Sequence, residues 1–448
     1  MRVIDEMAVY CQDRLAGHLR KTGEMTPRGL QVLYDFQYVD SALEEDLVSL
    51  AMPIGGRYDR LFDVPPAFQV SLPEGWVYKQ LVSAYGKAVD LSDPFALLKV
   101  AGRNPVGRVT FGGTRKPARL EDALRDVILH EDRRCWMQDV LEQVSPEHLG
   151  VSGAMPKLVV DAQDGYGPFV FDQHILKLEQ PRYFGIALAE EFALRCLANA
   201  GLDTVAAKRN DAGDALLVDR FDIRMGSPHP AEGSHPVKGE YLGFEDAAAL
   251  SGFCPDFKYN GSAQKLFAMI DRYVVEEKIV ADKEELLDRL LLNDILRNGD
   301  AHLKNFGLVY DALDRVRLAP GYDVLDTTLF LPRDFPAMTI RDVPFREMDA
   351  HRQWLTEDTL PQLWEVAELE GVGNRRQRYR RLQEVVWETA AHYRAEILAD
   401  AAIGDDRKTF VREMVKRLED RLRENPFSPC QAGVHSVSVS PAALSWQE

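Results

Sequence analysis

The segment NGDAHLKNFG, residues 298–307, holds the densest group of chemically capable side chains in the sequence. It follows an apolar helical pattern, and we expect that helix to end with a left-handed residue at Asn298 or Gly299. Asp300 precedes Asn305 by five positions. Kinase catalytic loops use this spacing to place an aspartate on the substrate hydroxyl and an asparagine on Mg²⁺. A polar turn, with both side chains bonded to local backbone, is the alternative.

A second carboxylate follows at Asp323, directly after the sequence APGY. The pattern over 309–318 predicts a hairpin, which would return Asp323 close to Asn305. One aspartate and one asparagine suffice for Mg²⁺ when ATP phosphates and water complete its oxygen shell. Taken alone, an aspartate that caps a turn is the commoner explanation.

Lys177 lies in the strand-like run HILKL. Burying an ammonium without a partner is costly, so a carboxylate on the next element and a phosphate are its expected partners. Glu190 and Glu191 are both available on a helix expected over 188–202. This would be the lysine and glutamate arrangement of kinases. An edge-strand lysine in water is the alternative.

The small-residue segment GVSGAMPK, residues 150–157, is not a Walker A loop, because it lacks the GxxxxGK[ST] pattern. Backbone N–H groups of such a loop could still approach phosphates. An ordinary strand entry is the alternative.

Composition narrows the classes of function. The 448 residues include 54 Lys and Arg against 71 Asp and Glu, a net charge of −17, which argues against binding nucleic acid through bulk charge. The five cysteines form no CxxC pair, which argues against a zinc ribbon or a disulfide framework and suits a reducing cytosol. No apolar run approaches ~18 residues and the first residues do not form a signal peptide, so we expect a cytoplasmic protein with no membrane partner.

The order of these segments resembles the HipA family of bacterial serine/threonine kinases, the toxins of type II toxin–antitoxin pairs. The matching landmarks, in chain order, are LPEGWVYKQL, DPFALLKVAGRNPVGRV, GAMPK, ILKLE, LVDRFD, GFEDAAALSG, GDAHLKNFG and LAPGYDVLDT. The resemblance implies an α+β, two-lobed protein-kinase-like fold, with a mixed α/β N-terminal part and a mostly helical C-terminal lobe. The implied divisions are a family-specific N-terminal subdomain over 1–125, a kinase N-lobe over 126–224, a helical C-lobe over 225–425 and a loose tail over 426–448.

The resemblance also implies roles for individual residues. Asp300 matches the catalytic aspartate, and Asn305 and Asp323 match the Mg²⁺ ligands. His302 would brace the catalytic loop, and Lys304 would lie near the phosphates. The residues expected to bind ATP are Ser152, Gly153, Ala154 and Lys157 of the loop, Lys177 with Glu191 as its partner, and Val218, Asp219 and Phe221 of the adenine hinge.

One position departs from the family. The serine that is self-phosphorylated in well-known members is replaced here by Gly150, and Ser152 carries the only side-chain hydroxyl between Gly150 and Lys157. Ser152 is therefore the candidate site of autophosphorylation.

The function expected from the resemblance is an ATP- and Mg²⁺-dependent protein kinase that acts as a toxin. Its partners would be a HipB-like helix-turn-helix antitoxin and a protein substrate such as an aminoacyl-tRNA synthetase, with DNA contacted only through the antitoxin. A small-molecule phosphotransferase and a catalytically silent corepressor are the alternatives. The arginine-rich stretch over 375–381 is interpreted as a solvated helix face, in preference to a surface for DNA or an acidic partner.

Overall fold

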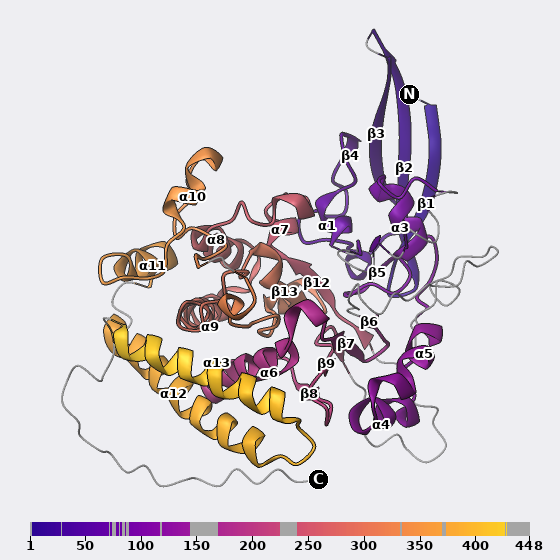
Figure 1. Ribbon diagram of the computed structural model, residues 1–448. Coiled ribbons are helices and arrows are strands. Elements are labelled where there is room, and N and C mark those ends of the chain that lie inside the picture. Colours follow the sequence, from indigo (N-terminus) through magenta and orange to yellow (C-terminus); the bar gives the residue numbers. More distant parts are fainter. Residues whose placement is uncertain are drawn as a thin grey trace, which may run out of the picture.

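The computed structural model describes residues 2–27, 29–70, 72–73, 78–79, 81–82, 86, 89–116, 119–143, 169–224, 240–331, 334–369, 373–425 and 427. Three long N-terminal strands project from one side of the molecule, and a pair of long C-terminal helices lies on the other (Figure 1). Smaller sheets and a group of helices fill the space between them.

The N-terminal module is built on an antiparallel sheet with strand order β4-β3-β2-β1-β5. Gln12 and Asp13, both with positive φ, make the tight turn between β1 and β2. Phe36, Phe68 and Phe111 pack edge to face in its core. Its elements are β1 (Arg2–Cys11), β2 (Arg14–Thr26), β3 (Gly29–Tyr38), β4 (Tyr58–Leu61), α1 (Pro66–Gln69), α3 (Pro94–Ala101) and β5 (Val109–Phe111).

The next part holds a four-stranded antiparallel sheet with order β6-β7-β9-β8. The helix that was expected after the strand lysine is α6, Ile186–Asn199, and Gly201 follows it with a φ of +81°. The other elements are α4 (Asp122–His130), α5 (Arg133–Gln143), β6 (Phe169–Val170), β7 (His174–Leu178), β8 (Ala207–Arg209), β9 (Ala215–Asp219), β10 (Ile223–Arg224) and β11 (Glu240–Tyr241).

The remaining part is mostly helical, with one small sheet of order β12-β13-β14. Its core is the largest of the molecule and includes most of the apolar face of α9. The elements are β12 (Gly243–Asp246), α7 (Ala247–Leu250), α8 (Ala263–Tyr273), α9 (Glu276–Ile295), β13 (Gly307–Tyr310), β14 (Arg317–Leu318), α10 (Met348–His351), α11 (Leu360–Ala367), α12 (Arg375–Ala399) and α13 (Asp405–Glu424).

The end of α9 differs from the sequence prediction. The left-handed residue is Arg297, with a φ of +56°, and not Asn298 or Gly299. The amide of Asn298 donates to the carbonyl of Asn293 at 2.9 Å, which closes the helix one residue early. Gly299 is needed for another reason, because a Cβ there would lie 2.8 Å from the carbonyl oxygen of Phe335.

Candidate functional site

The predicted hairpin forms and brings two distant polar residues together. Strands β13 and β14 pair antiparallel, with Leu308 opposite Leu318. Asp323 thereby returns to Asn305, whose Nδ2 donates to Asp323 Oδ2 at 3.1 Å. The prediction that this hairpin places the second carboxylate beside the first polar segment is confirmed.

The catalytic candidate Asp300 stands at the start of a tightly bonded turn. Its Oδ1 accepts a hydrogen bond of 2.6 Å from the hydroxyl of Tyr259. The ring of Tyr259 also meets the ring of His302 edge to face at 5.1 Å. The amide of His302 donates to Asn305 Oδ1 at 2.9 Å, so the asparagine holds the loop as well as facing Asp323. Tyr259 is a site residue that the sequence did not indicate, since it lies 41 positions away from Asp300.

The side chains of His302 and Lys304 lie in different environments. Burial lowers the pKa of His302, and its Nδ1 has no hydrogen-bond partner among the described residues. The ammonium of Lys304 lies 3.7 Å from Asp246, and its backbone carbonyl accepts from the hydroxyl of Tyr322 at 2.8 Å. Lys304 is thus held beside a carboxylate on β12.

Asp323 combines backbone strain with exposure. Its φ is +59°, in the left-handed region that a non-glycine residue enters at a cost of about 1–2 kcal/mol. Its side chain is 50% exposed although its neighbours are largely buried. The ammonium of Lys177 lowers the pKa of this carboxyl, so that Asp323 presents a negatively charged oxygen at the surface of the site.

Lys177 is held between two carboxylates. Its Nζ lies 2.5 Å from Glu190 Oε1 on α6 and 2.5 Å from Asp323 Oδ1. These two charges raise the pKa of Lys177, while burial raises the pKa of Glu190. Lys177 therefore stays charged.

The expectation that Glu191 is the lysine's partner is wrong. Successive residues of a helix point about 100° apart, so only one of two adjacent glutamates can face β7. Glu190 does, and Glu191 faces another side of the helix, where it accepts from Arg195 at 2.9 Å and from the hydroxyl of Tyr393 at 2.8 Å.

The three hinge candidates lie at the end of β9 and just after it. The side chain of Val218 is buried in the sheet core, and the amide of Asp219 donates to the carbonyl of Ala206 at 2.8 Å. The ring of Phe221 stacks on Tyr322, with centroids 5.4 Å apart. The hinge segment therefore lies next to the residue that precedes Asp323.

The oxygen atoms of Asn305 and Asp323 fit Mg²⁺, which prefers hard oxygen ligands and keeps several waters. Across the described ranges, no cluster of three or more His, Cys, Asp or Glu side chains could hold a metal by itself. A divalent ion at these two residues would therefore depend on further oxygens from a bound phosphate, as the sequence suggested.

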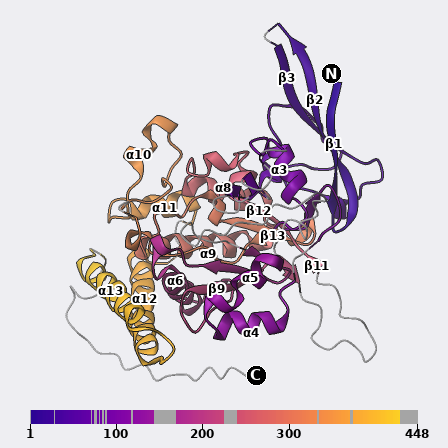
Figure 2. The same ribbon diagram turned by 45° about the vertical axis from the view of Figure 1, so that its right-hand side comes forward.

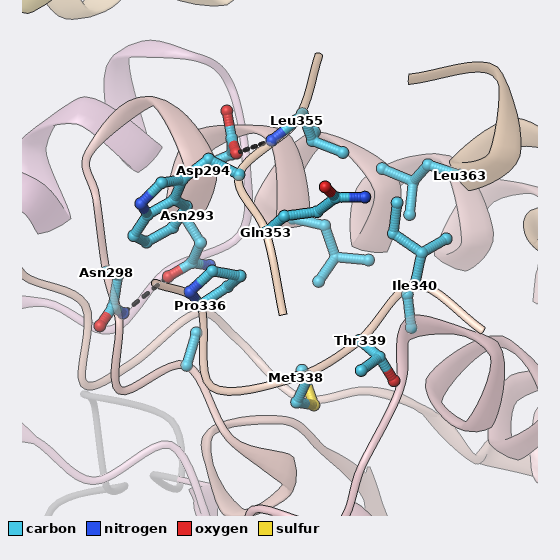
Figure 3. Close-up of a pocket in the computed structure, with 14 residues that line it drawn as sticks. Asn293, Asp294, Asn298, Pro336, Met338, Thr339, Ile340, Gln353, Leu355 and Leu363 are labelled. Atoms are coloured by element: carbon cyan, nitrogen blue, oxygen red, sulfur yellow. Dashed lines mark hydrogen bonds between the residues drawn. The ribbon is translucent and has the colours of Figure 1, made fainter. Parts of the chain in front are cut away.

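A cavity of about 70 Å³ lies next to the segment that carries Asp300, with Asn298 and Ala301 in its lining (Figure 3). Its lining is largely apolar, and most of its polar side chains form hydrogen bonds within the protein. Asp294 Oδ1 accepts from the amide of Leu355 at 2.7 Å, and Asn298 Nδ2 donates to Asn293 Oδ1 at 2.7 Å. Asn298 Oδ1 in turn accepts from the amide of Asp300 at 3.2 Å. The cavity wall thus supports the backbone of Asp300, the candidate catalytic residue.

Two further predictions concern the small-residue loop and the arginine-rich stretch. Gly150 and the loop residues Ser152, Gly153, Ala154 and Lys157 lie outside the described residues. In the arginine-rich stretch, Arg378 is not solvated as expected, because it forms an ion pair with the buried Asp288 of α9 at 2.5 Å.

Within the part of the chain that the structure describes, no helix is long and apolar enough to cross a membrane.

Comparisons with known proteins agree with the sequence resemblance. A family model described as the HipA-like C-terminal domain matches residues 149–397, and one described as the HipA N-terminal domain matches residues 7–112. The chain is 29% identical over 292 residues to a Sinorhizobium fredii protein named "Putative kinase Y4dM", which covers 60% of this chain and 63% of that protein. It is 23% identical over 303 residues to the serine/threonine-protein kinase toxin HipA of Shewanella oneidensis. This match covers 60% of this chain and 65% of that protein. The chain thus spans less than two thirds of the length of either relative.

A solved structure shares the fold over nearly the whole chain. It is the complex of HipA, HipB and operator DNA from Shewanella oneidensis, with a TM-score of 0.64 at 18% identity. The match covers 95% of this chain and 98% of that one. The predicted α+β, kinase-like fold is therefore confirmed.

Proposed function

The chain belongs to the HipA family, and on that premise we propose that it is an ATP- and Mg²⁺-dependent serine/threonine protein kinase. The observation that carries the proposal is the continuous contact from Glu190 through Lys177 and Asp323 to Asn305. Kinases need a lysine and glutamate ion pair and a metal-binding aspartate beside the catalytic loop.

Each residue of the site has a role that its position supports. Lys177 would bind ATP phosphates with its ammonium, while Glu190 fixes that ammonium in place. Asn305 and Asp323 would hold Mg²⁺, which supplies positive charge to the phosphates when bound. Asp300, with Oδ1 bonded to Tyr259, would accept the proton of the substrate hydroxyl on its other carboxylate oxygen.

The remaining sites are proposals of the same kind. Val218, Asp219 and Phe221 would contact adenine, and the loop residues Ser152, Gly153, Ala154 and Lys157 would contact the phosphates. Ser152 remains the proposed autophosphorylation site. The proposed divisions remain 1–125, 126–224, 225–425 and 426–448.

The proposed biological role is that of a toxin. The Shewanella oneidensis structure holds HipA with HipB and operator DNA, which supports a HipB-like antitoxin as the partner of this chain. The proposed substrate is a translation component such as an aminoacyl-tRNA synthetase, and contact with DNA would be through the antitoxin.

Labelled ATP tests the proposal. The purified protein is incubated with γ-³²P-ATP, Mg²⁺ and host lysate, beside Asp300→Asn and Lys177→Met. We expect a labelled protein band with the parent and none with either variant, while the melting temperature of Asp300→Asn stays close to that of the parent. Equal labelling by Asp300→Asn and the parent would refute the assignment of Asp300, and no labelling by the parent, with or without added Mg²⁺, would refute the kinase.

A further inference from the structure

Helix α6 presents two adjacent glutamates to two different parts of the molecule. Glu190 holds Lys177 of the site, at 2.5 Å. Glu191 is equally buried, and its ion pairs and hydrogen bonds within the described residues are to side chains outside the site. Its carboxylate is shared among Arg195 of α6, Arg209 at 3.2 Å and the hydroxyl of Tyr393 on α12. A buried carboxylate with three partners is expected to fix the helix that carries it.

The hairpin of α12 and α13 contacts α6 along its length, and the two views of the molecule agree that it lies against this helix (Figures 1 and 2). At the start of α6, a Cβ on Gly185 would lie 2.4 Å from the ring of Phe410 on α13. Just before α6, the carboxylate of Glu179 accepts hydrogen bonds from both terminal nitrogens of Arg407 on α13, at 2.7 and 2.9 Å.

The middle and the end of α6 are held in the same way. Arg195 donates to Glu396 on α12 at 2.5 Å, and the ring of Tyr393 packs on Phe192 with centroids 5.5 Å apart. At the last turn, Asn199 Nδ2 donates to Thr389 Oγ1 at 2.9 Å. The hairpin thus contacts α6 at its beginning, middle and end.

We propose that the contact of Glu191 with Arg209 and Tyr393 positions α6 so that Glu190 holds Lys177 in the geometry for phosphate binding. Glu191 and Tyr393 are therefore positioning residues, since they act on the site through α6. The claim that these contacts position α6 rests on the contacts alone. The claim that this position matters for phosphotransfer rests on the proposed kinase function.

The geometry makes the coupling direct. Glu190 and Glu191 are consecutive on one rigid helix, so a rotation that releases Glu191 from α12 also turns Glu190 away from β7. In protein kinases the position of the corresponding helix is a control point for activity. Here the α12–α13 hairpin would hold that helix in the paired position.

Chemical labelling of Lys177 tests the structural claim without any kinase assay. The probe is sulfo-N-hydroxysuccinimide acetate, and peptide mass spectrometry follows the acetylation of Lys177 against the exposed Lys116. Glu190→Gln removes the direct partner and sets the upper rate. We expect Tyr393→Phe and Glu191→Gln to raise the Lys177 rate relative to Lys116 by about fivefold, as a typical coupling between separated sites would.

Arg394→Gln is the matched control, because Arg394 pairs with Glu419 inside the hairpin, at 3.0 Å. It should leave the Lys177 rate unchanged. Tyr393→Phe removes a single hydroxyl and keeps the ring in place, so the test does not depend on the fold of Glu191→Gln. A Lys177 rate equal to that of the parent in Tyr393→Phe and in every folded Glu191 variant would overturn the proposal.

Phosphotransfer assays then separate the two claims. With the kinase function established, Tyr393→Phe should raise the KM for ATP and lower kcat, whereas the control should change neither. A parent without phosphotransfer would refute the kinase proposal and leave the labelling result standing. Faster Lys177 labelling with an unchanged KM for ATP would refute the catalytic meaning of the positioning.

Discussion

The two ends of the chain are joined to the central part by different chemistry. At the N-terminal junction, arginines donate to backbone carbonyls of the other part: Arg108 of the N-terminal module to that of Asp311, and Arg220 of the central part to that of Pro105. The C-terminal hairpin uses arginines that donate to carboxylates, as in Arg407 with Glu179, Arg195 with Glu396 and Arg209 with Asp400.

Exposure separates the two junctions further. In the N-terminal junction, the Arg220–Asp222 side chains are 0% and 1% exposed, and Asp222 also accepts from the amide of Gly107 at 2.7 Å. The C-terminal junction is hydrated only in part: the Arg195–Glu396 side chains are 38% and 48% exposed, whereas those of Arg407 and Glu179 are 12% and 8% exposed. A dry junction contributes mainly to stability, since breaking a buried pair leaves an uncompensated charge. Breaking exposed ion pairs costs less free energy of unfolding, but such pairs can still fix the position of the helix that they contact.

The largest effect should come from the dry junction. Asp222→Ala leaves the buried guanidinium of Arg220 and the amide of Gly107 without their carboxylate. We expect a loss of about 3–5 kcal/mol in the free energy of unfolding, measured by urea denaturation. Asp59→Ala, which removes an exposed ion pair with Arg57, is the control and should change little. Equal losses in both variants would contradict the comparison.

A smaller loss should follow from Arg407 of the C-terminal junction, because its buried carboxylate partner keeps a second hydrogen-bond donor. Arg407→Ala removes two hydrogen bonds to Glu179, whose Oε2 still accepts from the amide of Gly185 at 2.6 Å. We expect a loss of about 1.5–3 kcal/mol, the usual range for hydrogen bonds to charged groups. Arg423→Ala, which removes an exposed pair with Asp420 on the same helix, serves as the control. A loss as large as that of Asp222→Ala would show that both junctions are dry.

The dry junction should also respond to pH. Burial raises the pKa of Glu245 above 4.5, so the folded protein keeps this proton to higher pH than the unfolded chain does. The stability that the group contributes is fully present below pH 4.5 and is lost as the pH rises through the folded-state pKa. Glu245→Gln cannot ionise, and its amide can still accept from Leu50 and donate to Ser49.

The melting temperature of the parent minus that of Glu245→Gln should therefore fall between pH 4.5 and neutral pH. Subtracting the variant cancels the titration of the other carboxyl groups. A difference that stays constant across this interval would show that Glu245 keeps an ordinary pKa in the folded protein.

The smallest effect should be that of salt. Raising NaCl from about 0.1 to about 1 M shortens the Debye length from about 10 to about 3 Å, which weakens exposed ion pairs more than buried ones. We expect amide hydrogen exchange to become faster in α6, which the hydrated pairs hold, and to stay constant at Gly107, which faces Asp222. Faster exchange at both places would mean that salt acts on the whole fold.

The sequence predicted the parts of the site that depend on local spacing. The hairpin that joins Asn305 to Asp323 and the strand position of Lys177 follow from patterns within a few residues. The choice between Glu190 and Glu191 could not be made from the sequence. Both fall on α6, and its rotation depends on the distant α12–α13 hairpin that packs on it. Tyr259 and Tyr393 carry no local signal, since their partners lie 41 and 202 positions away.

The separation between Glu191 and Tyr393 has a consequence for synthesis on the ribosome. Domains form from the N-terminus as the chain emerges, so β7 and α6 can pack while Tyr393 has still to be made. A ribosome must add 202 further residues after Glu191 before the hydroxyl that holds it exists. The nascent chain would then carry Lys177 and the candidate catalytic residue Asp300 for some time without the contact proposed to position α6. If the protein is a toxin, the ribosome that makes it would release an aligned site only late in translation.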